Sequence, residues 1–188
     1  MEAAQIEEMV RESIACKKRL LGSIESVLMP FLVAAAGVID GGGTIFFCGN
    51  GGSSCDAAHA AGELIGWFMK KDRGPIAAVA LGHEIPALTA IANDSSYDEV
   101  FARQIQALGR PRDMLIGIST SGRSRNVALA LEKARAKGLV TVAWTGESRE
   151  GCGELAEHWV PVPSRETPRI QECHLLLVHT LCAYLESR

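Results

Sequence analysis

The chain has 188 residues, enough for one domain with a substantial core, and a formal net charge of −3. That charge excludes the basic surface of nucleic-acid-binding proteins, and six cysteines without a Cys-x-x-Cys pair favour reduced thiols in a cytoplasmic protein. The longest apolar run, 27–39, is far shorter than the ~20 residues of a membrane span, so no membrane segment is predicted.

Two helices are predicted over residues 1–40. Apolar residues recur at helical spacing in the first of them: Ile6, Met9, Val10 and Ile14. The pattern breaks near residue 22, and the second helix, 27–39, is apolar on nearly all sides. That character indicates burial on several faces, either in the core or in a subunit interface. Three glycines at 41–43 end this helix.

From residue 44 onward, short apolar runs alternate with helical patterns. The predicted strands cover 44–48, 76–81, 114–119, 140–144 and 159–162. The predicted helices cover 54–69, 84–92, 97–108, 124–137 and 168–186. Strands that are continuously apolar indicate a parallel sheet covered on both faces. We therefore predict an α/β fold in a single domain over 1–188, a three-layer αβα sandwich with about five parallel strands in 44–188, preceded by the helical pair.

A glycine- and serine-rich segment, residues 49–54, follows the first predicted strand and opens a helix. Backbone N–H groups and a helix N-terminus at the carboxyl end of a strand are suited to binding a phosphate. The segment differs from a dinucleotide-binding loop because its sixth position is Ser54 and because no acidic residue ends the next strand at Ala80 or Leu81. No nucleotide cofactor is predicted.

His59 and Glu63 lie four residues apart just after this segment. On a helix, that spacing puts an imidazole and a carboxylate on one face, one turn apart. The pair is suited to acid–base chemistry on a phosphorylated metabolite, and a purely structural pair is the alternative.

A second polar loop follows the third predicted strand. Four hydroxyl groups surround Gly122 there, those of Ser119, Thr120, Ser121 and Ser124. Hydroxyls together with a helix N-terminus favour a phosphate monoester as the ligand. The alternative is that one serine merely caps the helix.

The last predicted helix carries polar side chains among apolar ones: Gln171, Glu172, His174 and His179. Buried polar groups need partners, and His59, Glu63, Gln171 and His179 together could bind zinc through N and O ligands. However, Gln171 and His179 are about 12 Å apart along a helix. They could share one ion only by reaching toward a point between them or by coming from neighbouring subunits. His174 falls on a different face, which favours a structural role.

Four segments in this order resemble the phosphoheptose isomerases, a family of the sugar isomerase (SIS) domain superfamily: GNGGSSCDAAHAAGEL, ALTAIANDSSYDEVF, DMLIGISTSGRSRNV and RIQECHLLLVHTLC. The resemblance implies a flavodoxin-like SIS fold and the conversion of D-sedoheptulose 7-phosphate to D-glycero-D-manno-heptose 7-phosphate. That reaction is the first step toward nucleotide-activated heptose for bacterial surface glycans such as lipopolysaccharide. The resemblance also implies a homotetramer with active sites at subunit interfaces.

Residue roles follow from the same resemblance. It implies that Glu63 and His179 are the catalytic acid/base pair. It implies zinc ligation by His59, Glu63, Gln171 and His179. The implied substrate contacts are Gly51, Gly52, Ser53, Asn93, Asp94, Ser119, Thr120, Ser121, Ser124 and Gln171. The implied reaction moves a proton between two carbons through an enediol while a second group exchanges a proton between the oxygens.

Three positions depart from the family pattern. Trp67 stands where an arginine is common, and Lys70, Lys71 or Arg73 could supply the charge instead. Arg123 replaces a frequent asparagine, and Trp144 replaces a smaller residue. These departures leave two alternatives open: an isomerase of another sugar phosphate, and a non-catalytic SIS-domain regulator that binds a replication-initiation protein. Regulators of that kind lack the equivalents of Glu63 and His179.

Overall fold

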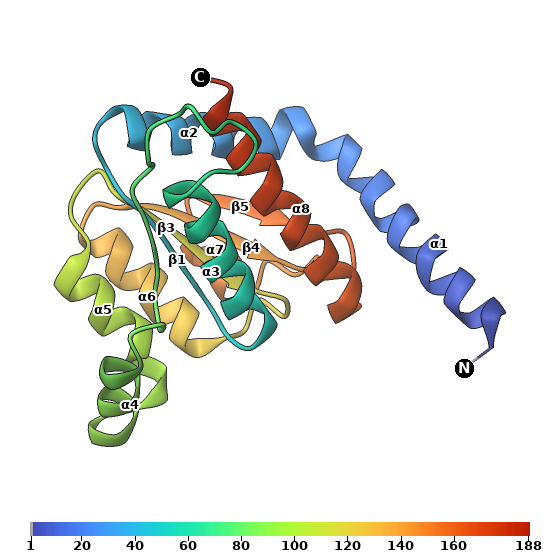
Figure 1. The fold of residues 1–188 in the computed structure, drawn as a ribbon. Coiled ribbons are helices and arrows are strands. Elements are labelled where there is room, and N and C mark those ends of the chain that lie inside the picture. Colours follow the sequence, from blue (N-terminus) through green and yellow to red (C-terminus); the bar gives the residue numbers. More distant parts are fainter. Residues whose placement is uncertain (1) are drawn as a thin grey trace.

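A five-stranded parallel sheet forms the centre of the molecule, and the computed structural model describes residues 2–188. The strands are β1 (Ile45–Gly49), β2 (Ala78–Ala80), β3 (Met114–Ser119), β4 (Val140–Thr145) and β5 (His158–Pro161). Their order is β2-β1-β3-β4-β5, so the chain winds outward in both directions from β1 and β3 (Figure 1). This order confirms the predicted parallel sheet. It also places the ends of β1 and β3 side by side at the switch point, where ligands bind in such sheets.

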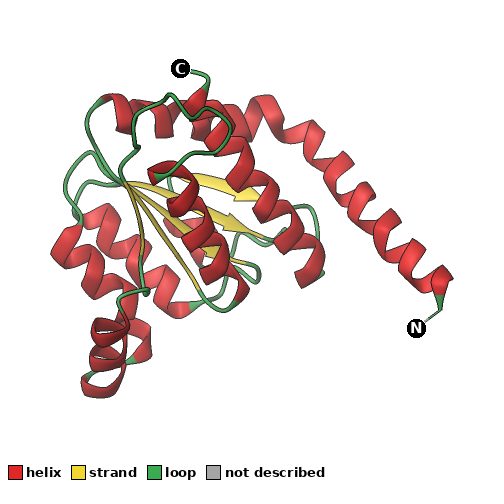
Figure 2. Ribbon diagram, in the orientation of Figure 1, coloured by secondary structure: helices red, strands yellow, loops and turns green. Residues whose placement is uncertain are grey.

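Helices cover both faces of the sheet, which confirms the three layers (Figure 2). They are α1 (Ala3–Leu20), α2 (Met29–Asp40), α3 (Gly52–Ile65), α4 (Ile85–Asp94), α5 (Val100–Leu108), α6 (Arg125–Ala136), α7 (Cys152–Leu155) and α8 (Thr167–Glu186). Short 3-10 turns cover Leu21–Ser23 and Tyr97–Glu99, and a π-helical turn covers Ile24–Leu28. The four-residue helix α7 was not predicted from the sequence.

The apolar runs of the strands are continuous because both faces are buried. In β1, Phe47 packs into the layer formed by α2, α3 and α8, whereas Phe46 and Cys48 pack into the layer of α5, α6 and α7. Successive side chains of a strand point to opposite faces, so each layer receives alternate residues. All of β1 and β3 is buried as a result.

The predicted helix over 54–69 is wrong at its end, because α3 stops at Ile65. Gly66 leaves the helical conformation at φ −80° and ψ −120°. The following N–H groups of residues 68–70 donate to the Glu186 carboxylate instead of to helical carbonyls. A tertiary contact thus replaces the last predicted turn of the helix.

Two further boundaries differ from the prediction. The strand predicted over 76–81 keeps only Ala78–Ala80, because the N–H of Ile76 donates to the carbonyl of Leu64 at the end of α3. The helix predicted over 27–39 begins within the π-helical turn, and α2 starts only at Met29, with Pro30 in its first turn. Proline has no N–H to donate, so Pro30 interrupts the hydrogen-bond pattern of the helical run where the π-helical turn passes into α2.

The helical run from Ala3 to Asp40 is by length and composition apolar enough to cross a membrane. Its apolar second half is accounted for by packing, since Phe31 and Ala35 of α2 are fully buried against the sheet. The first half of α1 instead extends away from the sheet (Figure 1). It leaves apolar side chains 44–54% exposed: Ile6, Met9, Val10 and Ile14.

His174 and Trp144 lie in the core, as a structural role for His174 requires. Both side chains are fully buried, with ring centroids 6.3 Å apart, and Trp144 also meets Phe31 edge-on. Burial lowers the pKa of His174 to about 4, against an opposing effect of the Thr145 backbone, so the ring is neutral. Trp144 therefore fills the core and does not reshape the ligand cavity.

Candidate active site

The loop between β1 and α3 makes the first half of the site. Gly51 has a φ of 56°, and Gly49 packs so closely on the helix that an added Cβ would lie 2.7 Å from the Ser53 carbonyl oxygen. The side chain of Asn50 exchanges two hydrogen bonds with Asn126 of α6, at 2.8 and 2.9 Å, which ties this loop to the next one. Close backbone approach at a helix N-terminus is the geometry of an anion site.

Gly49→Ala is expected to lower the free energy of unfolding by about 1–3 kcal/mol, because the Cβ would meet rigid backbone rather than a flexible side chain. Urea denaturation measures this change. Gly62→Ala in the same helix is the matched control: its Cβ meets nothing within 4 Å, and alanine favours a helix by up to about 1 kcal/mol. Equal destabilisation by both substitutions would contradict the close-packing account.

The loop between β3 and α6 makes the second half. The hydroxyls of Ser119 and Ser124 are 2.8 Å apart, and Ser121 accepts a hydrogen bond from the Arg123 N–H. Thr120, Ser121 and Arg123 line a cavity of about 630 Å³ that is completed by the loops after β4 and β5. Two of the four predicted hydroxyl residues, Thr120 and Ser121, thus line this cavity, whereas Ser119 and Ser124 contact each other. Arg123 adds a guanidinium group to the cavity.

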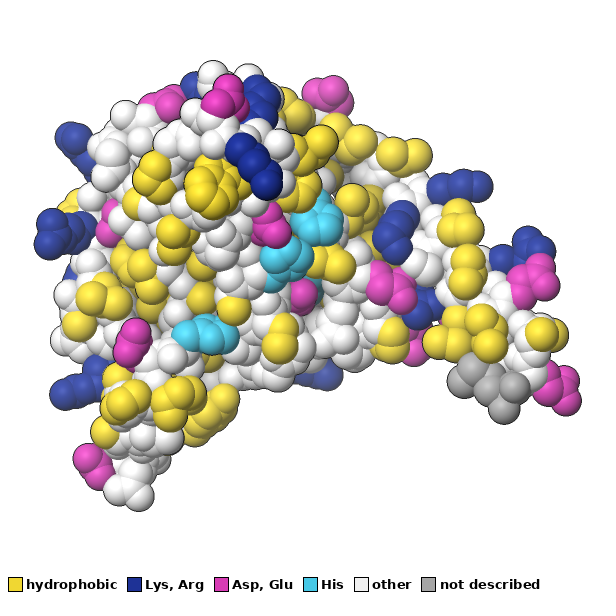
Figure 3. Space-filling model, viewed as in Figure 1, with side chains coloured by type: hydrophobic (Ala, Val, Ile, Leu, Met, Phe, Trp, Pro, Cys, Tyr) yellow, Lys and Arg dark blue, Asp and Glu magenta, His cyan; other side chains and the backbone are white. Residues whose placement is uncertain are grey.

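The predicted acid–base residues come together on the neighbouring helices α3 and α8. His59 Nε2 lies 3.1 Å from Glu63 Oε1, and the side chains are 38% and 25% exposed. The ring of His179, on α8, meets His59 edge-on with centroids 5.3 Å apart. The other face of His179 stacks on Phe68, with centroids 5.3 Å apart and an interplanar angle of 27°. Figure 3 shows histidine and acidic side chains gathered on this face of the molecule.

Asp56, one turn before His59 on α3, was not predicted as a site residue. Its Oδ2 is buried without a hydrogen-bond partner in the described structure. Burial raises the pKa of Asp56, and the opposing effect of His59 is smaller. The spacing of three residues to His59 is the sequence signal that could have identified Asp56.

Gln171 and His179 occupy different parts of the site, as their eight-residue separation on α8 suggested. Gln171 lies against the first loop, where a Cβ on Gly52 would be 2.5 Å from its Nε2. Asn93 and Asp94, at the end of α4, are exposed and hydrogen-bonded to each other at 2.7 Å. Among residues 2–188, no side-chain hydrogen bond or ion pair joins those two residues to either loop.

The predicted zinc ligands do not form a metal site as they stand. Within residues 2–188, no three His, Cys, Asp or Glu side chains are arranged to hold a metal ion. His59 and Glu63 bond to each other, and Gln171 packs on Gly52. Zinc binding by this set remains a prediction.

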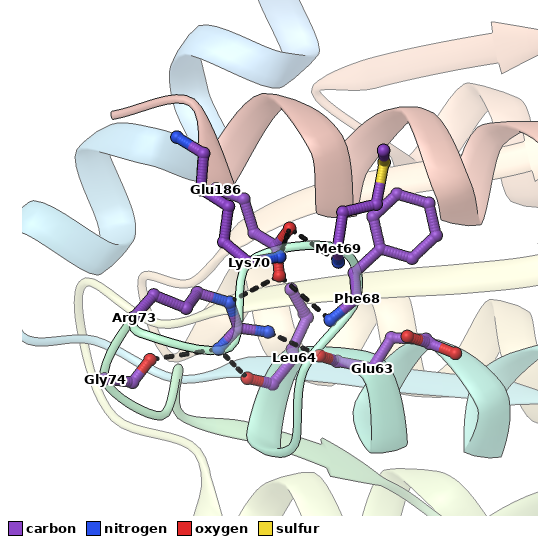
Figure 4. Close-up of polar contacts among 8 residues, drawn as sticks. All are labelled: Glu63, Leu64, Phe68, Met69, Lys70, Arg73, Gly74 and Glu186. Carbon is purple, nitrogen blue, oxygen red and sulfur yellow. Dashed lines mark hydrogen bonds and ion pairs between the residues drawn. The ribbon is translucent and has the colours of Figure 1, made fainter.

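A buried carboxylate at the end of α8 holds the loop that follows α3 (Figure 4). Glu186, 6% exposed, accepts hydrogen bonds from the backbone N–H groups of Phe68, Met69 and Lys70 at 2.9–3.0 Å. It also accepts a hydrogen bond from Arg73 Nε at 2.7 Å. We call Glu186, Arg73 and the backbone of 68–70 the Glu186 clamp.

Arg73 uses its remaining N–H groups on backbone carbonyls. Nη1 donates to Leu64 at 2.8 Å and Gly74 at 3.0 Å, and Nη2 donates to Glu63 (Figure 4). Because its guanidinium group is fully engaged, Arg73 is not free to replace the arginine that Trp67 displaces. Lys70 and Lys71 remain exposed candidates for that charge.

The clamp gives stability that depends on pH. Burial alone would raise the pKa of Glu186, but the hydrogen bonds from Arg73 and the loop N–H groups outweigh it and lower the pKa to about 2 from 4.5. The unfolded chain therefore binds a proton more readily, and this stabilisation is complete above pH 4.5 and disappears as the pH falls toward 2.

Glu186→Gln is expected to unfold more easily than the wild type at pH 7, and the difference in unfolding free energy should shrink as the pH falls from 4.5 toward 2. Urea titrations at several pH values measure this difference. A difference that stays constant down to pH 2.5 or so would contradict the lowered pKa of Glu186.

Known proteins resemble the whole chain. The SIS domain family profile matches residues 11–146. A phosphoheptose isomerase of Helicobacter pylori is 45% identical over 169 residues, which cover 90% of this chain and 88% of the relative. A phosphoheptose isomerase of Bradyrhizobium is 44% identical over 94% of this chain and 86% of the relative. The structure of phosphoheptose isomerase GmhA from Neisseria gonorrhoeae matches with a TM-score of 0.92, at 36% identity and 98% coverage of both chains.

Proposed function

Because this chain belongs to the phosphoheptose isomerases of the SIS domain family, we propose that it converts D-sedoheptulose 7-phosphate to D-glycero-D-manno-heptose 7-phosphate. The predicted family, fold and enzyme class are thereby confirmed. The observation that carries the proposal is the cluster of His59, Glu63 and His179, whose first two members lie on the helix that begins at the first phosphate-type loop. The product would enter the synthesis of nucleotide-activated heptose.

Glu63 is the proposed base that removes the proton from the substrate carbon. A carboxylate can take a proton from C1 of the ketose and return a proton to C2 of the enediol. His59, 3.1 Å away, restricts the Glu63 carboxylate to one orientation. His179 is the proposed acid/base for the substrate oxygens, because its ring lies next to this pair on the facing helix.

The phosphate end of the substrate is proposed to lie at the two loops. Ser119, Thr120, Ser121 and Ser124 supply hydroxyls, and Gly51, Gly52 and Ser53 supply the first helix N-terminus. Neither Glu63 nor His179 lines the cavity at the second loop. This separation suits a heptose 7-phosphate, since the reacting carbons and the phosphate are at opposite ends of the sugar. Gln171, which lies beside Gly52, is the proposed contact to the sugar between the two ends. Asn93 and Asp94 remain proposed contacts from α4.

We propose zinc binding only after the side chains rearrange. The proposed ligands are then His59, Glu63, Gln171 and His179. When bound, zinc would polarise the substrate carbonyl. Elemental analysis of the purified protein, together with assays in chelator, tests this proposal. Zinc below one-tenth of an equivalent with full activity would count against it.

A homotetramer with active sites at subunit interfaces, in the cytoplasm, is also proposed. Two features support it: the exposed apolar side chains of α1 and an apolar groove of about 520 Å³ between the N-terminal helices and α8, lined by residues such as Leu21, Ile24 and Leu176. Light scattering of the purified protein measures the number of subunits.

Substrate comparison tests the proposed function. The wild-type protein should convert sedoheptulose 7-phosphate with a much higher kcat/KM than arabinose, hexulose or amino-sugar phosphates. Preference for one of those would favour another sugar-phosphate isomerase. Absence of turnover with all of them would favour the non-catalytic regulator, although Glu63 and His179 are both present.

A further inference from the structure

We propose that the Glu186 clamp is a positioning device that fixes both acid/base residues, Glu63 and His179, relative to each other. The inference rests on the proposed function, which assigns those two roles. Glu186 and Arg73 themselves do not touch the His59–Glu63 contact, so they act through the residues that they hold.

The first connection runs to His179 through Phe68. Glu186 accepts the Phe68 N–H at 2.9 Å, and the Phe68 ring stacks on His179. His179 precedes Glu186 by seven residues on α8, so both lie on one face of the helix. The His179 ring therefore has two aromatic neighbours: His59 is nearly perpendicular to it, and Phe68 stacks on it. Together these contacts hold the plane of the His179 ring.

The second connection runs to Glu63 through Arg73. Arg73 donates to the backbone carbonyls of Glu63 and Leu64, which are left without helical partners where α3 ends. The same guanidinium binds the Glu186 carboxylate. One side chain therefore joins the last turn of α3 to the last turn of α8 (Figure 4).

The clamp holds the Glu186 carboxylate by donors that are themselves held in place. Here every donor is fixed: three consecutive N–H groups and the planar fork of an arginine. The buried Cys182 lies between the clamp and the active site. Burial, followed by the nearby Glu63 and Glu186 carboxylates, raises the pKa of its thiol to about 12. A neutral thiol there leaves the two carboxylates undisturbed by a third charge.

Three variants test the device in the full-length protein. Glu186→Gln keeps the size of the side chain. Arg73→Lys keeps the charge, but its three donors cannot reach the three carbonyls and the carboxylate that Arg73 holds. Phe68→Leu leaves all clamp hydrogen bonds in place. Each should lower kcat by about 10- to 100-fold, since misplacement by about 1 Å costs that much, while KM changes less than about threefold. The Glu186→Gln/Arg73→Lys double variant should be no worse than the poorer single variant, because both break one device.

Arg188→Ala is the matched control. It breaks an exposed ion pair with Asp40 at the same end of α8, and its kcat should equal that of the wild type. Histidine NMR gives a readout independent of substrate: the His179 signals, assigned with His179→Gln, should lose the ring-current shift from Phe68 in Glu186→Gln.

The outcomes separate the clamp from the proposed function. A folded Glu186→Gln variant with wild-type kcat and unmoved His179 signals, or a folded Phe68→Leu variant with wild-type kcat, would overturn the inference. If Glu186→Gln fails to fold, Phe68→Leu decides in its place. A wild-type protein that does not turn over sedoheptulose 7-phosphate would count against the proposed function, while the His179 signals would still decide whether the clamp orients that ring.

Discussion

Glu63→Gln is expected to lower kcat by about 10²- to 10⁴-fold without changing the fold or the oligomer. Glutamine keeps the size of the side chain and can still contact His59, but it cannot accept a proton from C1 of the ketose. KM should change little, because Glu63 does not line the cavity of the phosphate loop. Steady-state kinetics with sedoheptulose 7-phosphate measure both constants.

Glu132→Gln, on the exposed side of α6, is the control for loss of a carboxylate charge. It should behave as the wild type. Turnover by Glu63→Gln within about tenfold of the wild type would remove Glu63 from the role of carbon base. Asp56, two turns earlier on α3 and with a raised pKa, would then be the next carboxylate to replace.

His179→Gln is the second substitution with a large expected effect, again about 10²- to 10⁴-fold in kcat. It removes the imidazole that lies next to the His59–Glu63 pair and leaves those two residues in place. Deuterium exchange at the substrate carbon should survive in this variant better than net turnover does, because proton removal from carbon by Glu63 precedes transfer between the oxygens.

His158→Gln, on β5, is the histidine control and should keep full activity. If His179→Gln turned over substrate normally, the oxygens would have to exchange their proton without His179. If His179→Gln lost deuterium exchange at the substrate carbon as fully as it lost turnover, His179 would instead take part in the removal of the proton from carbon.

The sheet could be predicted because its signal is local. β1 and β3 are continuous apolar runs, since each side of the sheet buries alternate residues such as Phe46 and Phe47 of β1. The polar loops at 49–54 and 119–124 follow strands that proved to be neighbours, so their meeting at one end of the sheet also follows from topology.

What could not be predicted depends on contacts between distant segments. α3 ends at Ile65 because Glu186, more than 110 residues away, takes the N–H groups of residues 68–70. No local pattern marks Phe68 as the residue that stacks on His179. The separation of Gln171 from His179, by contrast, was evident from helical geometry, and Gln171 lies beside Gly52 at the first loop.

Incubation of the purified protein with sedoheptulose 7-phosphate in D2O, followed by NMR, tests the central claim most directly. Proton transfer through an enediol at Glu63 predicts a new heptose 7-phosphate that carries deuterium at C2. Deuterium at any carbon other than C1 and C2 would contradict the enediol route, and the absence of any conversion would contradict the assigned substrate.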